Sequence, residues 1–277
     1  MKIAIKGVRG SIPASGPETS HFGGNTSCVT VTDDNNMLIL DGGSGLQKVK
    51  IPSKPSKRID ILLTHLHMDH IQGLGFFQPL FDPRMEVHIW APTSVTLNLH
   101  ARLSRFLSPP LFPVLLRDLP CKLALHEISN SDFKIGPFKI SSRFIIHAGP
   151  TVGFRVETKN STLAYIPDHE PALGPEGIIP DKKWISGFDI ISEADLLIHD
   201  AQFTSKEYKH KLGWGHSSME DALKIAFLGG VKRLLLFHHD PSRTDGELHA
   251  INDKLQKKYS STLDFEFAQE GTEIELG

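Results

Sequence analysis

Six short apolar runs, each followed by histidine or aspartate, constrain this sequence more than any other feature. The runs cover residues 37–40, 59–63, 144–146, 162–166, 196–198 and 234–237, and the polar residues that follow them include Asp41, His65, His147, Asp168, His199, Asp200 and His238. Continuous runs of Val, Ile and Leu are typical of buried strands in a sheet covered on both faces. Because ligands in layered α/β proteins collect beyond the carboxyl ends of strands, the sequence predicts a layered α/β protein with one polar site at those ends.

Helices are predicted between the strands from their capping residues. Ser217 and Glu220 have the spacing of a capping box, as do Thr244 and Glu247, and each pair precedes an amphipathic stretch. A third helix is predicted over residues 93–107, where it ends before two prolines.

The chain length of 277 residues fits one domain, and we expect a single domain over residues 1–277. The segment 76–130 is rich in Phe, Pro and Leu and is predicted to be an irregular insertion that covers one side of a cleft. Phe76, Phe77 and Phe81 would form the roof of that cleft.

Charge and cysteine content exclude several classes of protein. With 30 Lys and Arg against 32 Asp and Glu, the chain lacks the bulk positive charge that grips long nucleic acid, so we expect long nucleic acid not to be a partner. No apolar run is long enough to cross a membrane or to form a signal peptide, which predicts a cytoplasmic protein without a membrane partner. The two cysteines, Cys28 and Cys121, cannot form a disulfide framework and fit a reducing compartment.

The segment 64–70 reads Thr-His-Leu-His-Met-Asp-His and is the strongest chemical signal in a chain with 15 histidines. His65, His67, Asp69 and His70 are four metal-ligand side chains on a loop directly after a strand. Imidazole and carboxylate together suit Zn, Mn or Fe better than Ca or Mg. Four protein groups would overfill one open catalytic site but suit two metal ions that act together. The loop therefore predicts a dinuclear site, with Zn favoured and Mn or Fe as alternatives.

The HxHxDH pattern after a strand resembles the hallmark of the metallo-β-lactamase fold superfamily. The resemblance implies an α/β fold, specifically an αββα four-layer sandwich, with two divalent metal ions at one edge. It assigns His65, His67 and His147 to the first metal, Asp69, His70 and His238 to the second, and Asp168 to a bridge between them. His239 is the alternative to His238. Asp41 matches an early aspartate that orients the metal loop.

Further motifs resemble the phosphodiesterase branch of that superfamily, which includes ribonuclease Z and the phosphoribosyl cyclic phosphodiesterase. They are the segments 7–13, 23–27, 199–203 and 215–218. The resemblance gives Asp200 and His216 the role of a proton relay. Asp200 stands where ribonuclease Z has Glu, the last motif is 237–241 rather than the ribonuclease ending, and no long basic arm is visible. These departures favour a small cyclic nucleotide or related phosphodiester over tRNA.

The sequence as a whole predicts a dinuclear metal-dependent phosphodiesterase. Its predicted catalytic residues are Asp69, Asp168, Asp200 and His216, with His216 donating a proton to the leaving oxygen. Two alternatives stay open: a carboxylic ester, thioester or lactone hydrolase on the same fold, and a nucleotide-binding or sensing module with little turnover. The sequence also leaves open whether the chain forms a homodimer.

Overall fold

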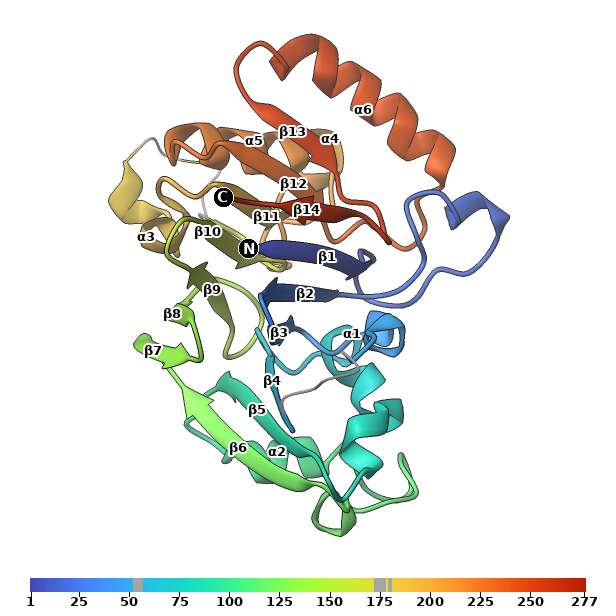
Figure 1. Ribbon diagram of the computed structural model, residues 1–277. Coiled ribbons are helices and arrows are strands. Elements are labelled where there is room, and N and C mark those ends of the chain that lie inside the picture. The colour runs from blue at the N-terminus through green and yellow to red at the C-terminus, as the bar shows by residue number, and fades with distance from the viewer. Residues whose placement is uncertain (52–56, 172–177, 179–180) are drawn as a thin grey trace.

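Two seven-stranded sheets pack face to face in the computed structural model, which describes residues 1–51, 57–171, 178 and 181–277 (Figure 1). The first sheet has the order β14-β1-β2-β3-β4-β5-β6, and the second has the order β13-β12-β11-β10-β9-β8-β7. The strands are β1 (Lys2–Gly7), β2 (Cys28–Asp33), β3 (Asn36–Leu40), β4 (Arg58–Leu62), β5 (Glu86–Pro92), β6 (Lys122–Ile128), β7 (Ser131–Ile135), β8 (Phe138–Phe144), β9 (Val152–Glu157), β10 (Thr162–Ile166), β11 (Leu196–Asp200), β12 (Arg233–Phe237), β13 (Asp264–Phe267) and β14 (Glu273–Glu275).

Helices cover the outer face of each sheet. The α-helices are α1 (Met68–Ile71), α2 (Leu99–Ser104), α3 (Phe188–Ile191), α4 (Ser205–Tyr208), α5 (Met219–Leu228) and α6 (Asp245–Tyr259), and the 3₁₀ helices are η1 (Pro17–Thr19), η2 (Ser44–Lys48), η3 (Gln72–Phe76), η4 (Gln78–Phe81), η5 (Leu116–Asp118) and η6 (Lys182–Trp184). One apolar core lies between the sheets, a second joins α3, α5 and α6 to the outer face of the second sheet, and a third joins η2, η3 and α2 to the first sheet. The predicted αββα four-layer sandwich is confirmed.

The strands that carry the polar residues end at one edge of the molecule. β3 pairs in parallel with β4 in the first sheet, and β10, β11 and β12 run parallel in the second. β8 has the same direction as β10, because β9 lies between them and pairs antiparallel with both. The carboxyl ends of these strands therefore lie at one edge of each sheet, and the close approach of side chains that follow β4, β8, β10 and β12 shows that the two edges meet, as the apolar runs predicted.

Local sequence signals set most of the helix boundaries. Thr244 caps α6 with a complete capping box, as predicted. At α5 the cap is Ser218, whose hydroxyl accepts the Asp221 N–H, so the prediction of Ser217 was wrong by one residue. The Ser217 hydroxyl instead donates to the carbonyl of His169.

The segment 76–130 is more regular than predicted. β5 and β6 extend the first sheet in parallel register beyond β4, because alternate residues of β5, such as Val87 and Ile89, face the third core. The helix predicted over 93–107 is wrong at its start, since Thr93 continues the sheet by donating to the Ile128 carbonyl and Asn98 caps the shorter α2. The extent of the insertion and the single-domain organisation stay predictions.

The helices and the two cysteines can be compared with the sequence analysis. Within the described ranges, the helices are all too short or too polar to cross a bilayer. Cys28 and Cys121 are both buried free thiols. The chain ends meet at the first sheet, where the Met1 ammonium donates to the Leu276 carbonyl at 2.8 Å.

Candidate metal centre

The polar edge of the sandwich brings together the side chains that the sequence singled out. Donor atoms of His65, His67 and His147 lie within 4.8 Å of one another, and a second group with the same spacing contains Asp69, His70, Asp168 and His238. We call the first group the imidazole set, and Asp69, His70 and His238 the carboxylate set, with Asp168 between the two. His65 and His67 follow β4, Asp69 and His70 lie in α1, and the remaining members follow β8, β10 and β12.

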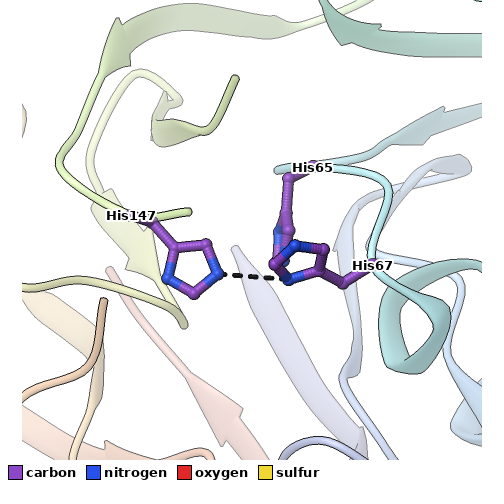
Figure 2. Close-up of side chains that lie close together, drawn as sticks. All are labelled: His65, His67 and His147. Atoms are coloured by element: carbon purple, nitrogen blue, oxygen red, sulfur yellow. Dashed lines mark hydrogen bonds between the residues drawn. The ribbon is translucent and has the colours of Figure 1, made fainter. Parts of the chain in front are cut away.

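The imidazole set consists of three rings from two loops that face a common point (Figure 2). His147 Nε2 lies 3.2 Å from His67 Nδ1. His147 Nδ1 donates to the Gly215 carbonyl at 2.6 Å, which leaves a lone pair on Nε2. Burial lowers the pKa of all three rings, and the neighbouring imidazoles lower the pKa of His65 and His67 further. Neutral imidazole is the form that binds a metal ion.

The carboxylate set is buried, and the carboxylates of Asp41 and Asp168 lie beside it. Asp69 Oδ2 lies 3.3 Å from His70 Nε2 and 3.2 Å from His238 Nε2, and it accepts the backbone N–H of Ser11 at 2.7 Å. Burial alone would lower the pKa of His70, but the carboxylates of Asp168, Asp41 and Asp69 raise it well above its usual value. The set therefore attracts positive charge, as a cation site does.

Asp168 lies between the two sets. Its Oδ2 atom is 3.8 Å from His65 Nε2, 3.6 Å from His147 Nε2 and 3.3 Å from His238 Nε2. Its Oδ1 atom is 3.0 Å from His70 Nε2. Burial alone would raise the pKa of Asp168, but the surrounding imidazoles of His238, His70 and His65 hold it well below its usual value. A single carboxylate thus reaches both sets of donors.

The donor spacing and the missing hydrogen bonds both fit bound cations. Two ligands of a tetrahedral ion, each about 2.1 Å from it, lie about 3.4 Å apart. The spacing of 3.2–3.3 Å within both sets matches this value. In the described part of the chain, His65 Nε2 is buried and has no hydrogen-bond partner, and the buried atoms His70 Nε2 and Asp168 Oδ1, although 3.0 Å apart, do not meet in hydrogen-bond geometry. Since buried polar atoms are rarely left without a partner, these atoms fit direct bonds to a metal ion.

Asp41 supports the metal loop from behind, as the resemblance implied. Its carboxylate accepts the Thr64 N–H at 2.7 Å and the Tyr165 hydroxyl at 2.9 Å, and it lies 2.8 Å from His70 Nδ1. Hydrogen bonding at Nδ1 leaves Nε2 of His70 to face the set. Asp41 and His238 both have positive φ, 59° and 61°. This conformation is uncommon for residues other than glycine, and such strain is concentrated at functional sites.

His216 and Asp200 form a pair beside the two sets. His216 Nδ1 lies 2.7 Å from Asp200 Oδ2 and 3.9 Å from Asp168 Oδ2, and its ring stacks on His238 at a centroid distance of 4.9 Å. Burial would lower the pKa of His216, but the Asp200 carboxylate raises it to about 9. The ring therefore carries a proton near neutral pH. Bound cations would lower this pKa by repulsion.

A match to a known protein family shows which superfamily this chain belongs to. Residues 38–239 match the family described as Beta-lactamase superfamily domain, which is well over half of the chain. The chain belongs to the beta-lactamase superfamily. The matched range begins in β3 and ends just after His238, so it contains both sets of donors.

Within this superfamily, ribonuclease Z proteins are similar to most of the chain. Ribonuclease Z of Gemmatimonas aurantiaca is 24% identical, with 90% of each chain covered. The fold also matches human tRNase Z, short form (20% identity, all of both chains, TM-score 0.68) and a diphosphatase of the PhnP family (18%, 100% of this chain and 98% of that one, TM-score 0.69). Zn²⁺-bound PqqB of Methylobacterium extorquens matches at 17% identity over all of both chains, with a TM-score of 0.70. The predicted resemblance to the phosphodiesterase branch is confirmed, whereas the expectation that long nucleic acid is no partner does not fit the ribonuclease relatives.

Some site features of this superfamily member could not be read from the sequence. His239 lies away from the donors, with Nε2 2.8 Å from the Ala268 carbonyl, so the structure favours His238 over its neighbour. His199 is also outside the two sets and lies against His169. Glu170 accepts the N–H groups of Gly213 and Gly215, both at 2.8 Å, and so holds the loop that leads to His216. Gly213 and Gly215 lie 43 and 45 residues away from Glu170 in the sequence, and no motif signals such a contact.

Proposed function

We propose that this chain is a dinuclear metal-dependent phosphodiesterase. The observation that carries the proposal is the position of Asp168, whose two carboxylate oxygens approach donors of both sets within 3.0–3.8 Å. His65, His67 and His147 would hold one ion, Asp69, His70 and His238 the other, and Asp168 would contact both. Mixed imidazole and carboxylate ligands favour Zn²⁺, with Mn and Fe as alternatives.

Hydrolysis of a phosphodiester would need both the cations and the side chains beside them. Two cations in such a site neutralise the phosphoryl oxygens and activate the attacking water. His216 would donate a proton to the leaving oxygen, and its Nδ1 contact with Asp200 leaves Nε2 as the donor atom. Asp200 is fixed in turn by the backbone N–H groups of His169 and Gln202, both at 3.0 Å, so it holds the imidazole in one orientation.

The substrate class that we propose is a nucleic-acid phosphodiester rather than an isolated cyclic nucleotide. The ribonuclease Z relatives cover most of this chain and are named for cleavage of RNA, which supports a substrate with a nucleotide chain. The net charge of −2 weighs against binding through bulk positive charge, so local contacts near the cations would hold the substrate.

A substrate panel tests the proposal against its rivals. Protein reconstituted with Zn²⁺ or Mn²⁺ is assayed on bis(p-nitrophenyl) phosphate, a short RNA, 2′,3′-cyclic AMP, p-nitrophenyl acetate and a lactone. We expect turnover of the phosphodiesters and its loss with chelator. Turnover of the carboxylic ester or lactone alone would identify an ester hydrolase, and binding of nucleotides without any turnover would identify a sensing module.

A further inference from the structure

A cavity of about 350 Å³ lies directly beside the imidazole set. His65 and His67 form one part of its wall, residues 148–150 after His147 form another, and the segment from α2 to Leu111 supplies the rest. Because two of the proposed metal ligands line the cavity, a group bound there lies next to the reacting phosphodiester. Its volume falls within the range of small-ligand sites and fits one nucleoside.

The cavity wall combines apolar surface with positive charge. Met68, Phe106 and Leu111 contribute apolar surface, and Met68 and Leu111 are 49% and 67% exposed, so this surface is open to a ligand. Arg102 and Arg105 also line the cavity, and its described lining residues include no Asp or Glu. A ligand with a planar apolar part and a negative charge complements this wall.

The segment 76–130 supplies this wall, but through different residues than predicted. Phe77 is buried in the third core, and Phe81 packs against the same core. Phe106 and Leu111, rather than Phe76, Phe77 or Phe81, line the cavity beside His67.

The two arginines differ in what they can bind. Arg102 Nη2 donates to the Pro92 carbonyl at 2.6 Å and to Glu127 Oε1 at 3.1 Å, so its charge is partly neutralised. Arg105 directly follows α2 and is exposed, and across the described ranges its guanidinium has neither a hydrogen bond nor an ion pair. An unpaired guanidinium is suited to a phosphate, which it can contact through two parallel hydrogen bonds.

We propose that this cavity is a subsite for a nucleoside that carries a second phosphate. The base would pack on Phe106 and Leu111, and the second phosphate would pair with Arg105. The proposal rests on the proposed function, because the first phosphate is the phosphodiester held at the cations. Stacking on an aromatic ring accepts any base, so the subsite would not select a sequence. A cyclic mononucleotide has no second phosphate, and the subsite therefore selects a strand end or a short oligonucleotide over it.

Chromogenic substrates that differ by one phosphate test the subsite. Thymidine 5′-(p-nitrophenyl phosphate) is compared with the same ester carrying a 3′-phosphate, and thymidine 3′-(p-nitrophenyl phosphate) is compared with its 5′-phosphorylated form. For at least one pair we expect the second phosphate to lower KM about tenfold. Arg105→Gln should remove this preference and leave bis(p-nitrophenyl) phosphate unaffected. Leu111→Ser should raise KM for every thymidine substrate and leave the preference for the second phosphate unchanged, because Leu111 contacts the apolar part of the ligand.

Arg117→Gln is the matched control, because Arg117 is an exposed arginine paired with Asp118 outside the cavity. A second readout needs no activity: calorimetric binding of thymidine 3′,5′-bisphosphate to metal-free protein in chelator, which Arg105→Gln should weaken about tenfold. Phosphodiester turnover without any preference in either pair would overturn the subsite and leave the proposed function standing. Absent turnover with bisphosphate binding that depends on Arg105 would overturn the proposed function and support the subsite. Bisphosphate binding that is equal in wild type, Arg105→Gln and Arg117→Gln would overturn the subsite.

Discussion

The two donor sets differ in burial and charge although they share Asp168. In the carboxylate set Asp69, His70 and His238 are all buried, and the carboxylates of Asp41 and Asp168 lie next to His70. In the imidazole set His67 is exposed and borders the cavity, and the set has no carboxylate of its own. We infer that the carboxylate set holds its cation more tightly and that the imidazole set faces the substrate. Substitutions of the shared Asp168, of His216 beside the sets, of the exposed His67 and of the residues behind the carboxylate set should therefore reduce turnover or metal binding by different amounts.

The largest effect should follow removal of the shared carboxylate. Asp168→Ala should abolish phosphodiester turnover and lower binding of both cations, because the Asp168 carboxylate lies within reach of both sets. The fold should survive, since Asp168 belongs to none of the three apolar cores. Turnover, metal content and circular dichroism are compared with wild type. A folded variant with wild-type activity would show that the sets do not act together.

The next largest effect should come from His216, which belongs to neither set. His216→Ala should keep both cations and slow hydrolysis by roughly 10²–10⁴-fold for a ribose leaving group, which needs a proton as it departs. The loss should shrink for p-nitrophenolate. Asp200→Asn should show the same dependence on leaving group more weakly, because it changes only the orientation and basicity of the ring. Equal small losses for both leaving groups would remove His216 from the mechanism.

A substitution in the imidazole set should weaken binding of one cation and leave binding of the other unchanged. In His67→Ala, dialysis against graded chelator should release one equivalent of metal at a chelator concentration that leaves two in wild type. The other equivalent should stay, because the buried carboxylate set is unchanged. Elemental analysis after each step measures both. If the variant holds two equivalents as firmly as wild type, the imidazole set does not bind a cation through His67.

The smallest effects should come from the residues behind the carboxylate set. Asp41→Asn should weaken metal binding by about 10–100-fold, because the amide cannot hold both His70 and Thr64 as the carboxylate does. Tyr165→Phe removes one hydrogen bond to Asp41 and should weaken metal binding by about fivefold. Competition with a chromogenic chelator measures both affinities. A larger effect of Tyr165→Phe than of Asp41→Asn would contradict this order.

The sequence predicted the layers and the edge of the sheets, because both depend on local patterns. Apolar runs predicted the strands, and the short spacing in 64–70 predicted a metal loop whose four donors lie near one another. Contacts between distant segments were beyond such reasoning. Glu170 accepts hydrogen bonds from Gly213 and Gly215, and Arg105 lines the same cavity as His65 and His67. Both arrangements arise only when separate loops meet in the folded chain.

Boundaries failed where two local signals competed. Ser217 and Ser218 are both good caps, and only the tertiary hydrogen bond from Ser217 to the His169 carbonyl left Ser218 to cap α5. In the segment 76–130, proline and phenylalanine suggested an irregular chain, yet β5 pairs with β4 and β6 pairs with β5, so two parts of the segment belong to the sheet. Tertiary pairing overrides local preference in strands more readily than in helices.

The number of cations per chain tests the central claim most directly. Protein reconstituted with excess Zn²⁺ and freed of loosely bound metal is analysed for zinc and for protein by amino-acid analysis. Two sets of donors joined by Asp168 predict close to two zinc ions per chain, with loss of phosphodiester turnover as the ratio falls. One ion or fewer per chain in fully active protein would contradict the dinuclear account.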